Sequence, residues 1–266
     1  MSDSKPLALV TGASSGIGFE LARQLAERGY DLVVNAEDDT RLQQAAQRIR
    51  AAGARVEAVR ADLRDPGQIE RLFAAATTLG RPLDVVVLNA GVGRGGAFVD
   101  TDLADELEII DLNVRSTVHL AKLVLRDMAA RDEGRVLVTS SIASTMPGSF
   151  QAVYNASKSF LQSFTEALQN ELKATGVTLT SLMPGPTETD FFHRAGMDDT
   201  KVGRQDKDDP AQVARQGLDA LLAGKDKIVA GSVKTKAQAA ANRVLPDSLK
   251  AEAHRKMAEP GSGDEG

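Results

Sequence analysis

The chain has 266 residues, of which 42% are hydrophobic and 26% are charged, a composition typical of a globular protein with a large core. Its 32 Lys and Arg residues against 37 Asp and Glu give a net charge of −5, which argues against nucleic acid as a partner. There is no cysteine, so disulfides, thiolate nucleophiles and zinc sites built on cysteine are excluded.

The first apolar run, Leu7 to Val10, is too short for the core of a signal peptide. No stretch reaches the roughly 18 apolar residues that a membrane-spanning helix needs. We therefore expect a soluble cytoplasmic protein with no membrane partner.

Seven short runs rich in β-branched residues alternate with longer segments of helical period. Several runs lack polar alternation, as expected of parallel strands that helices cover on both faces. We therefore predict an α/β fold with a doubly wound, Rossmann-like parallel sheet, forming a single domain over residues 1–258. The runs are Leu7–Val10, Leu32–Val34, Val56–Val59, Val85–Leu88, Val136–Val138, Val177–Leu182 and Ile228–Val229.

Between the runs, a helix is predicted over Phe19–Arg28, and Gly29 follows it as a stop signal. Two segments break the alternation. Residues 198–210 are charged and contain a glycine, so we predict a mobile loop that closes over a ligand. Residues 259–266 are rich in glycine and acidic residues, so we predict a disordered tail.

The first run leads into Thr11-Gly12-Ala13-Ser14-Ser15-Gly16-Ile17-Gly18 and then directly into a helix. Gly12 permits a tight turn, Gly16 lets the backbone approach a pyrophosphate, and Gly18 permits close helix packing. No Lys-Ser or Lys-Thr pair follows, so the segment is not a Walker A loop. It predicts a dinucleotide site, and a glycine turn without a ligand is the alternative.

Further motifs follow the glycine loop in order. Asn89-Ala90-Gly91 ends the fourth run, Ser141 follows the fifth, and Tyr154-Asn155-Ala156-Ser157-Lys158 lies near the start of a helix. With these motifs the sequence resembles the compact single-domain form of the short-chain dehydrogenase/reductase family, over roughly residues 6–246. The resemblance implies an oxidoreductase that moves hydride between a nicotinamide cofactor, NAD(P)(H), and a small-molecule carbonyl or secondary alcohol.

Tyr154 and Lys158 are four residues apart, so on a helix their polar ends share a face. A free phenol has a pKa of about 10, too high for efficient proton exchange near neutrality. A positive charge at ~4 Å with an effective dielectric constant of ~20 is worth about 4 kcal/mol, or roughly three pKa units before desolvation opposes it. We therefore expect Lys158 to lower the pKa of Tyr154 and make it the acid/base.

Ser141 precedes Tyr154 by thirteen residues and follows a strand, at the sheet edge where ligands bind in this architecture. There it can hydrogen-bond a substrate carbonyl oxygen. The resemblance implies this role for Ser141, proton transfer for Tyr154, and binding of the nicotinamide ribose for Lys158. It also implies an asparagine that supports a water relay to the lysine, for which Asn113 is the candidate. The alternatives to these assignments are Ser140 and Asn89.

The resemblance also assigns residues to other parts of the cofactor. The backbone of Thr187 and the hydroxyl of Thr189 would orient the carboxamide, and Asp62 would lie against the adenine, unless it caps a helix or turn. The complete predicted cofactor-binding set is Gly12, Ser14, Ser15, Gly16, Ile17, Gly18, Glu37, Asp62, Leu63, Asn89, Ala90, Gly91, Tyr154, Lys158, Pro184, Gly185, Thr187 and Thr189.

The choice of cofactor depends on the residues after the second run. In relatives that use the phosphorylated cofactor, a basic residue commonly matches Glu37 or lies near Ser15, and neither position is basic here. Beside Glu37, a 2′-phosphate would meet like charge, whereas a ribose diol can donate to the carboxylate. We predict a preference for NAD(H). NADP(H) stays open, because most NAD-dependent relatives carry the acid where this chain has Ala36, and Arg41 is a nearby cation.

The substrate pocket is expected between residues 144–151 and 191–210. His193 and Arg194 leave open a site for a substrate carboxylate. The three histidines, His119, His193 and His254, share no metal-ligand spacing, so we predict no metal site and expect each in the core or at the surface. The resemblance implies a homodimer or homotetramer formed through the long helices. The apolar walls are predicted to be Met146, Phe150, Phe191 and Phe192.

Two other functions stay open. A catalytically silent dinucleotide-binding regulatory protein would have the same fold, but loss of Ser141, Tyr154 or Lys158 would have favoured it, and all three are present. A sugar-nucleotide epimerase or dehydratase of the same superfamily resembles a longer form with another glycine spacing, whereas only about 80 residues follow the Pro-Gly segment here.

Overall fold

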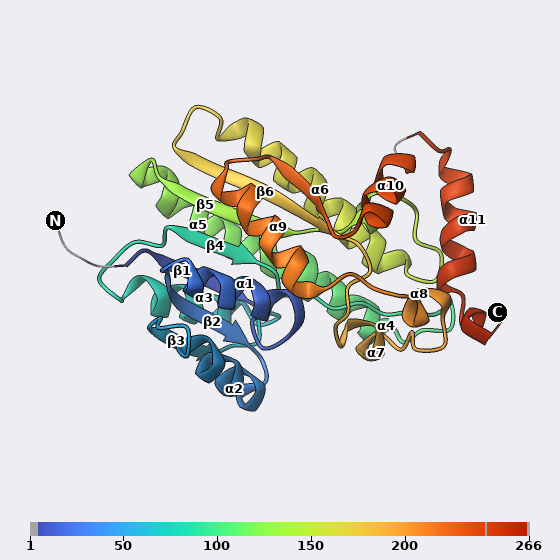
Figure 1. Cartoon of the computed structure of the whole chain (residues 1–266), viewed down its shortest axis with the longest axis horizontal. Coiled ribbons are helices and arrows are strands. Elements are labelled where there is room, and N and C mark those ends of the chain that lie inside the picture. The colour runs from blue at the N-terminus through green and yellow to red at the C-terminus, as the bar shows by residue number, and fades with distance from the viewer. Residues whose placement is uncertain (1–4, 243, 265–266) are drawn as a thin grey trace.

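The computed structural model describes residues 5–242 and 244–264 (Figure 1). In this part of the chain, seven parallel strands form one sheet in the order β3-β2-β1-β4-β5-β6-β7. Each of the seven predicted runs lies within one strand, which confirms the doubly wound, Rossmann-like architecture. The strands are β1 (Leu7–Thr11), β2 (Asp31–Ala36), β3 (Val56–Arg60), β4 (Val85–Leu88), β5 (Gly134–Thr139), β6 (Val177–Pro184) and β7 (Lys227–Ala230).

Helices connect the strands and cover both faces of the sheet. Apolar side chains of α1, α2 and α9 pack on one face, and those of α3, α5 and α6 pack on the other. The α-helices are α1 (Gly16–Glu27), α2 (Asp39–Arg50), α3 (Pro66–Thr77), α4 (Leu103–Ile109), α5 (Ser116–Arg131), α6 (Ala152–Glu171), α7 (Phe191–Arg194), α8 (Lys201–Arg204), α9 (Pro210–Leu222), α10 (Val233–Ala241) and α11 (Asp247–Ala258); the other turns are the π-helical η1 (Ile110–Arg115) and the 3-10 turns η2 (Ile142–Thr145) and η3 (Ser262–Asp264).

The central strands are apolar on both sides because both sides are covered. Along β1, Val10 belongs to the core beneath α1 and α9, whereas the preceding Leu9 belongs to the core beneath α3, α5 and α6. The chain crosses over between β1 and β4, which are neighbours in the sheet. In this topology the loops diverge at the carboxyl ends of those two strands and leave a crevice for a ligand.

A smaller structure covers the carboxyl ends of the strands. It consists of α7, α8, α10, α11 and η3, which lie together at the end of the molecule opposite the N-terminus (Figure 1). The segment of α7 and α8 shares an apolar cluster with α11, formed by Phe192, Ala195, Met197 and Ala258. Because α10 contributes no residue to this cluster, we use the name cap for α7, α8, α11 and η3 only. Within residues 5–242 and 244–264, no helix has both the length and the apolarity needed to cross a membrane.

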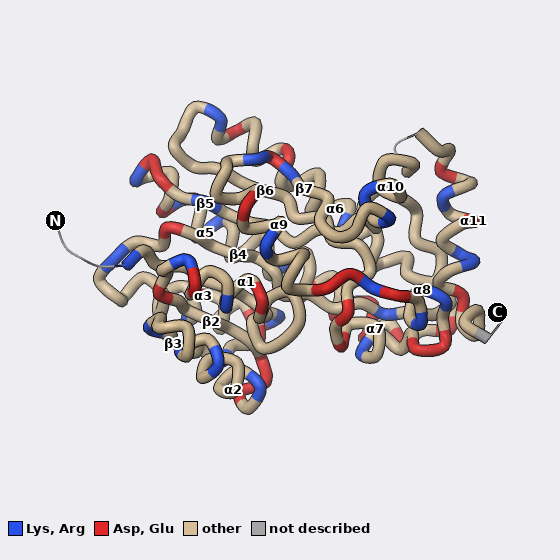
Figure 2. The backbone as a smooth tube through the Cα atoms, viewed as in Figure 1, with Lys and Arg blue, Asp and Glu red and all other residues tan. Residues whose placement is uncertain are grey.

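The structure differs from the expected mobile loop at residues 198–210. This charged run (Figure 2) contains α8, and Thr200, which is 1% exposed, accepts a hydrogen bond from the Gly203 amide at 3.0 Å. Asp208 is also buried and accepts a 2.6 Å hydrogen bond from the Thr235 hydroxyl. Two buried polar side chains thus anchor the segment, while most of its charged residues stay exposed.

The structure also differs from the expected disordered tail. The Gly261 amide donates to the Asp199 carboxylate, and the Gly263 amide donates to the Asp199 carbonyl, both at 2.8 Å. The Ser262 hydroxyl accepts from the Lys201 amide at 3.1 Å. Contacts with Asp199 and with Lys201 of α8 thus hold residues 261–263, which sequence composition alone does not indicate. Residues 265–266 lie outside the described residues.

Candidate active site

The predicted site residues converge on one crevice at the carboxyl ends of the strands. All 18 members of the predicted cofactor-binding set line this crevice, and so does Ser141. Asn113 is not among the lining residues. Gln151, from the segment expected to surround the substrate pocket, also lines the crevice, as does Ser140, the alternative to Ser141. Residues that were not predicted line it too, among them Thr139, Gln238, His254 and Met257.

The glycine loop leaves the space that a pyrophosphate needs. A Cβ atom on Gly18 would lie 2.1 Å from the Gly12 carbonyl oxygen, and one on Gly16 would lie 2.9 Å from the Thr189 methyl group. Gly12 has φ +65°, which favours glycine. α1 begins at Gly16, and the side chain of its N-cap, Ser15, makes no cap hydrogen bond. The first-turn amides and this hydroxyl therefore fit a dinucleotide phosphate.

Asn89 joins the ends of three neighbouring strands beneath the crevice. Its Nδ2 donates to the Thr11 carbonyl at 3.2 Å, and its backbone amide donates to the Thr11 hydroxyl at 3.0 Å. Its Oδ1 accepts from the Thr139 hydroxyl at 3.1 Å. These bonds fix β1, β4 and β5 relative to one another, so Asn89 shapes the floor of the cofactor crevice.

The structure brings together Ser141, Tyr154 and Lys158. Tyr154 and Lys158 lie one turn apart on α6, with Lys158 Nζ 5.7 Å from the centre of the tyrosine ring. Ser141 follows β5, caps η2 by accepting from the Ala143 amide at 3.1 Å, and donates to the Pro184 carbonyl at 3.3 Å; its hydroxyl is close enough to Tyr154 to act on the pKa of the phenol. Lys158 is 5% exposed, and its Nζ donates to the Thr139 carbonyl at 2.9 Å.

Burial, and not the lysine charge, controls the acidity of this group. Burial raises the pKa of Tyr154 to about 12, although its hydrogen bond with Ser141 acts in the opposite direction. Burial also lowers the pKa of Lys158 to about 8. The expectation that Lys158 lowers the pKa of Tyr154 is therefore wrong for the protein alone, because Lys158 Nζ donates to the Thr139 carbonyl and lies 5.7 Å from the centre of the tyrosine ring.

Asn113 is fully buried in η1, where its side chain bonds to other protein groups. Oδ1 accepts from the Val92 amide at 2.9 Å, and Nδ2 donates to the Val92 carbonyl at 2.9 Å and to the Ser157 hydroxyl at 3.0 Å. Both amide hydrogens are therefore used within the protein. Asn113 ties the segment after Gly91 to α6, which makes it a positioning residue in this structure.

Arg64 connects the acidic residues at the end of the crevice where the adenosine of the cofactor is expected. Arg64 contacts the carboxylates of Glu37 at 2.6 Å and Asp62 at 2.8 Å, and it also pairs with Glu108. The hydrogen bond from Arg64 lowers the pKa of Asp62. No sequence pattern marks this arginine as a site residue, because two of its partners, Glu37 and Glu108, come from distant segments. Arg41 instead pairs with Asp190 at 2.6 Å.

The substrate side of the crevice has apolar walls. Met146, Phe191 and Phe192 line it as predicted, and the Phe191 ring centre lies 5.2 Å from that of Tyr154. Phe150 is not a lining residue; it packs against the cap core with its ring 5.4 Å from the Arg255 guanidinium. The expectation that it forms a wall is wrong, because its φ of +63° belongs to a turn that carries the ring into the cap.

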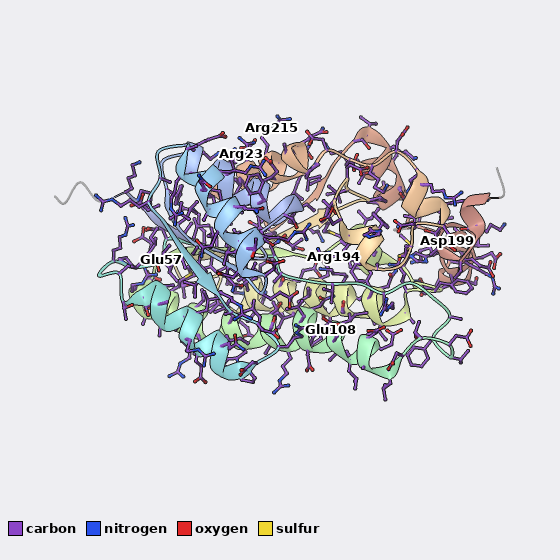
Figure 3. The ribbon with its side chains drawn as sticks, turned by 90° about the horizontal axis from the view of Figure 1, so that it is seen from below. Arg23, Glu57, Glu108, Arg194, Asp199 and Arg215 are labelled. Atoms are coloured by element: carbon purple, nitrogen blue, oxygen red, sulfur yellow. The ribbon has the colours of Figure 1, made fainter. Side chains whose placement is uncertain are left out.

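The two charged candidates for a substrate carboxylate lie at different places. His193 is exposed and pairs with Asp198 at 2.7 Å, and it does not line the crevice. Arg194 lines the crevice and a small hollow at its rim that it shares with Glu108 (Figure 3). Within residues 5–242 and 244–264, no three His, Asp or Glu side chains are grouped to hold a metal ion.

Comparisons with known proteins agree with this geometry. The family model described as short chain dehydrogenase matches residues 6–200. Ketoacyl reductase HetN of Nostoc sp. is 33% identical over 195 residues, covering 73% of this chain and 66% of that protein.

Among solved structures, a short chain dehydrogenase/reductase from Burkholderia phymatum in complex with NAD has a TM-score of 0.83 and 25% identity, covering 98% of this chain and 99% of that one. A short-chain dehydrogenase from Sphingobium yanoikuyae in complex with NADPH has a TM-score of 0.79 and 29% identity, covering 84% and 87%. The fold, the glycine loop and the Ser-Tyr-Lys group agree with the family match, and the chain belongs to the short-chain dehydrogenase/reductase family.

Proposed function

We propose that this oxidoreductase transfers hydride between NAD(P)(H) and the carbonyl or secondary alcohol carbon of a small molecule, with Ser141, Tyr154 and Lys158 as its catalytic residues. The observation that carries the proposal is that these three side chains lie together in the crevice that also contains the glycine loop. A relative named as a ketoacyl reductase supports a carbonyl substrate.

Each of the three residues has a defined task in carbonyl reduction. Ser141 donates a hydrogen bond to the substrate oxygen and holds it beside Tyr154. The neutral phenol of Tyr154 then donates its proton to that oxygen. A nicotinamide held in the crevice would supply the hydride that the carbon receives. Lys158, which is protonated below its pKa of about 8, stabilises the resulting phenolate and would hold the nicotinamide ribose. In alcohol oxidation the same proton moves back to Tyr154.

We also propose that NAD(H) is preferred over NADP(H). Arg64 pairs with Glu37, but it is also shared with Asp62 and Glu108. Arg60 lies beside them and donates to the Glu37 carbonyl at 3.1 Å. Three carboxylates against these two guanidinium groups leave this end of the crevice acidic. A 2′-phosphate would add nearly two negative charges there, whereas a ribose hydroxyl can donate to Glu37. One structural neighbour was solved with NAD and another with NADPH, so both cofactors occur among proteins of this fold.

The proposed assembly is a homodimer or homotetramer. α4 carries exposed Leu103 and Leu107, and Phe160 on the neighbouring α6 is 41% exposed. Large exposed side chains on adjacent helices mark an apolar surface that association would cover. A second copy of the chain supplies an identical surface, as a symmetric dimer requires.

The proposed chemistry is tested by replacing Tyr154 with Phe, which keeps the ring and removes the proton. We expect kcat to fall by about 10²–10⁴-fold, the usual contribution of a general acid. Cofactor affinity, measured by titrating nicotinamide fluorescence, is expected to change less than about threefold. Retained turnover would reject Tyr154 as the acid/base, and a wild-type protein that binds cofactor but reduces no carbonyl would favour the regulatory alternative.

A further inference from the structure

Two polar side chains face the substrate part of the crevice but have no task in the proposed chemistry. Gln151 directly precedes α6, and His254 lies on α11. Most of their neighbours in this part of the wall are apolar. A polar group in such surroundings costs free energy unless it is hydrogen-bonded. The apolar neighbours are Ile142, Met146, Phe191, Phe192, Met257 and Ala258.

Gln151 has a buried donor without a partner. The side chain is 7% exposed, and its Nε2 makes no hydrogen bond with any residue that the structure describes. Although Gln151 is the N-cap of α6, its side chain makes no cap bond. An unsatisfied buried donor costs about 1–3 kcal/mol. Gln151 lines the same crevice as Tyr154, which lies three residues further on in the first turn of α6. The amide therefore lacks an acceptor that a ligand bound beside Tyr154 supplies.

His254 offers an acceptor. Its Nδ1 lies 2.9 Å from the Ser149 carbonyl oxygen, and since a carbonyl only accepts, Nδ1 carries the hydrogen. Burial lowers the pKa of His254, so the ring is neutral and its Nε2 accepts a hydrogen bond. His254 lies beyond residue 200, where the match to the family model ends. This acceptor therefore comes from the C-terminal segment of this chain.

The loop between the two side chains is held in a strained conformation. Phe150 has φ +63°, which a non-glycine residue adopts at a cost of about 1–3 kcal/mol. Its carbonyl accepts from the Gly96 amide at 2.9 Å, and the neighbouring Ser149 hydroxyl donates to the Ala251 carbonyl of α11 at 3.2 Å. Contacts on both sides thus fix Gln151 beside Tyr154 and fix α11 against the same loop.

We propose that Gln151 and His254 form a polar subsite for a second, uncharged oxygen group of the substrate. Gln151 donates to that oxygen, and His254 accepts from it where it is a hydroxyl. The substrate class is then a ketone with a further hydroxyl or carbonyl group, or the corresponding alcohol. The proposal rests on the proposed function, because it assumes that the reacting carbonyl lies at Ser141 and Tyr154.

Two ketones of equal size test the subsite. 4-Hydroxy-2-butanone and 2-pentanone differ only in a hydroxyl in place of a methyl group, and each is supplied with NADH and with NADPH. We expect Gln151→Met to lower kcat/KM for the hydroxyketone by about tenfold or more, from the lost hydrogen bond. The value for 2-pentanone is expected to change less than about threefold. His254→Leu is expected to give the same selective loss.

The control is Gln238→Met, which makes the same change at a half-buried glutamine of α10 that also lines the crevice. We expect it to change kcat/KM for both ketones by the same factor. If Gln151→Met does not fold, as judged by cofactor binding, Gln151→Glu keeps the shape and replaces the donor by an acceptor, and the same selective loss is expected. Equal changes for both ketones in the Gln151 and His254 variants would overturn the subsite alone. A wild-type protein that reduces no ketone would instead overturn the proposed function.

Discussion

At the residue scale, burial of Lys158 has a consequence for stability. Its pKa is about 8 in the folded protein against an ordinary value of 10.5. Between these pH values the unfolded chain holds a proton that the folded protein lacks, so the free energy of unfolding rises with pH. Tyr154 acts in the opposite direction above pH 10, because its raised pKa keeps a proton in the folded state that the unfolded chain loses.

We therefore expect Lys158→Met to remove a pH-dependent gain in stability. The free energy of unfolding of the wild type is expected to rise relative to the variant by about 1–3 kcal/mol as the pH rises from 8 to 10. Urea unfolding at several pH values measures this difference. Lys122→Met, a change at an exposed lysine of α5, is the control. Its free energy of unfolding is expected to change with pH in parallel with that of the wild type. A parallel Lys158→Met curve would contradict the inferred pKa.

The proposed preference for NAD(H) is also tested at the residue scale, at Glu37. We expect kcat/KM to be at least tenfold higher with NADH than with NADPH, a difference of about 1.4 kcal/mol. Glu37→Gln removes one like charge from the neighbourhood of the 2′-phosphate and is expected to reduce this preference by about tenfold. The matched control is Glu57→Gln on β3, which does not line the crevice. A wild-type preference for NADPH would contradict the proposal.

The motif residues were predictable because the residues of each motif are close together in the sequence. Tyr154 and Lys158 are one helical turn apart, and the glycine loop is continuous, so local geometry alone places them. Arg64 and His254 were missed for the opposite reason. Each owes its position to contacts with distant segments, Arg64 with Glu37 and Glu108, and His254 with Ser149.

At the element scale, the strands were easier to predict than the turns between them. β4 has the predicted bounds, and the other six strands extend the predicted runs by one or two residues at one or both ends, where polar residues such as Asp31 continue the ladder. The π-helical turn η1 had no local signal. It forms where the buried Asn113 side chain bonds to Val92 and Ser157, which only the folded chain brings near.

The cap has its own small core, so it is expected to open independently of the sheet. Met197 is fully buried in the cap cluster. We expect Met197→Ala, at a cost of about 2–5 kcal/mol, to speed hydrogen exchange in α8 and α11 while β1 and β4 keep their protection. Hydrogen exchange read by mass spectrometry distinguishes these segments. Leu9→Ala in the main core is the comparison, and it is expected to speed exchange in the strands. A uniform increase in Met197→Ala would show that cap and sheet unfold together.

At the scale of the whole molecule, the proposed association through α4 and α6 predicts a change of mass. We expect light scattering after size-exclusion chromatography to give a dimer or tetramer for the wild type, and a smaller species for Leu107→Asp and Phe160→Asp, because a charge in an apolar contact is costly to desolvate. Val233→Asp changes an apolar residue of α10 that is 83% exposed and serves as the control. A monomeric wild type would contradict the assembly.

The two ends of the described chain lie at opposite ends of the molecule (Figure 1). Lys5 leads into β1 at the amino ends of the strands, opposite the crevice, whereas η3 packs on α8. Purification tags will therefore act unequally. A tag fused before residue 5 leaves the crevice clear, but one fused behind η3 crowds the cap, whose residues Met257 and Ala258 line the crevice. We therefore expect assays on a C-terminal fusion to give too low an activity.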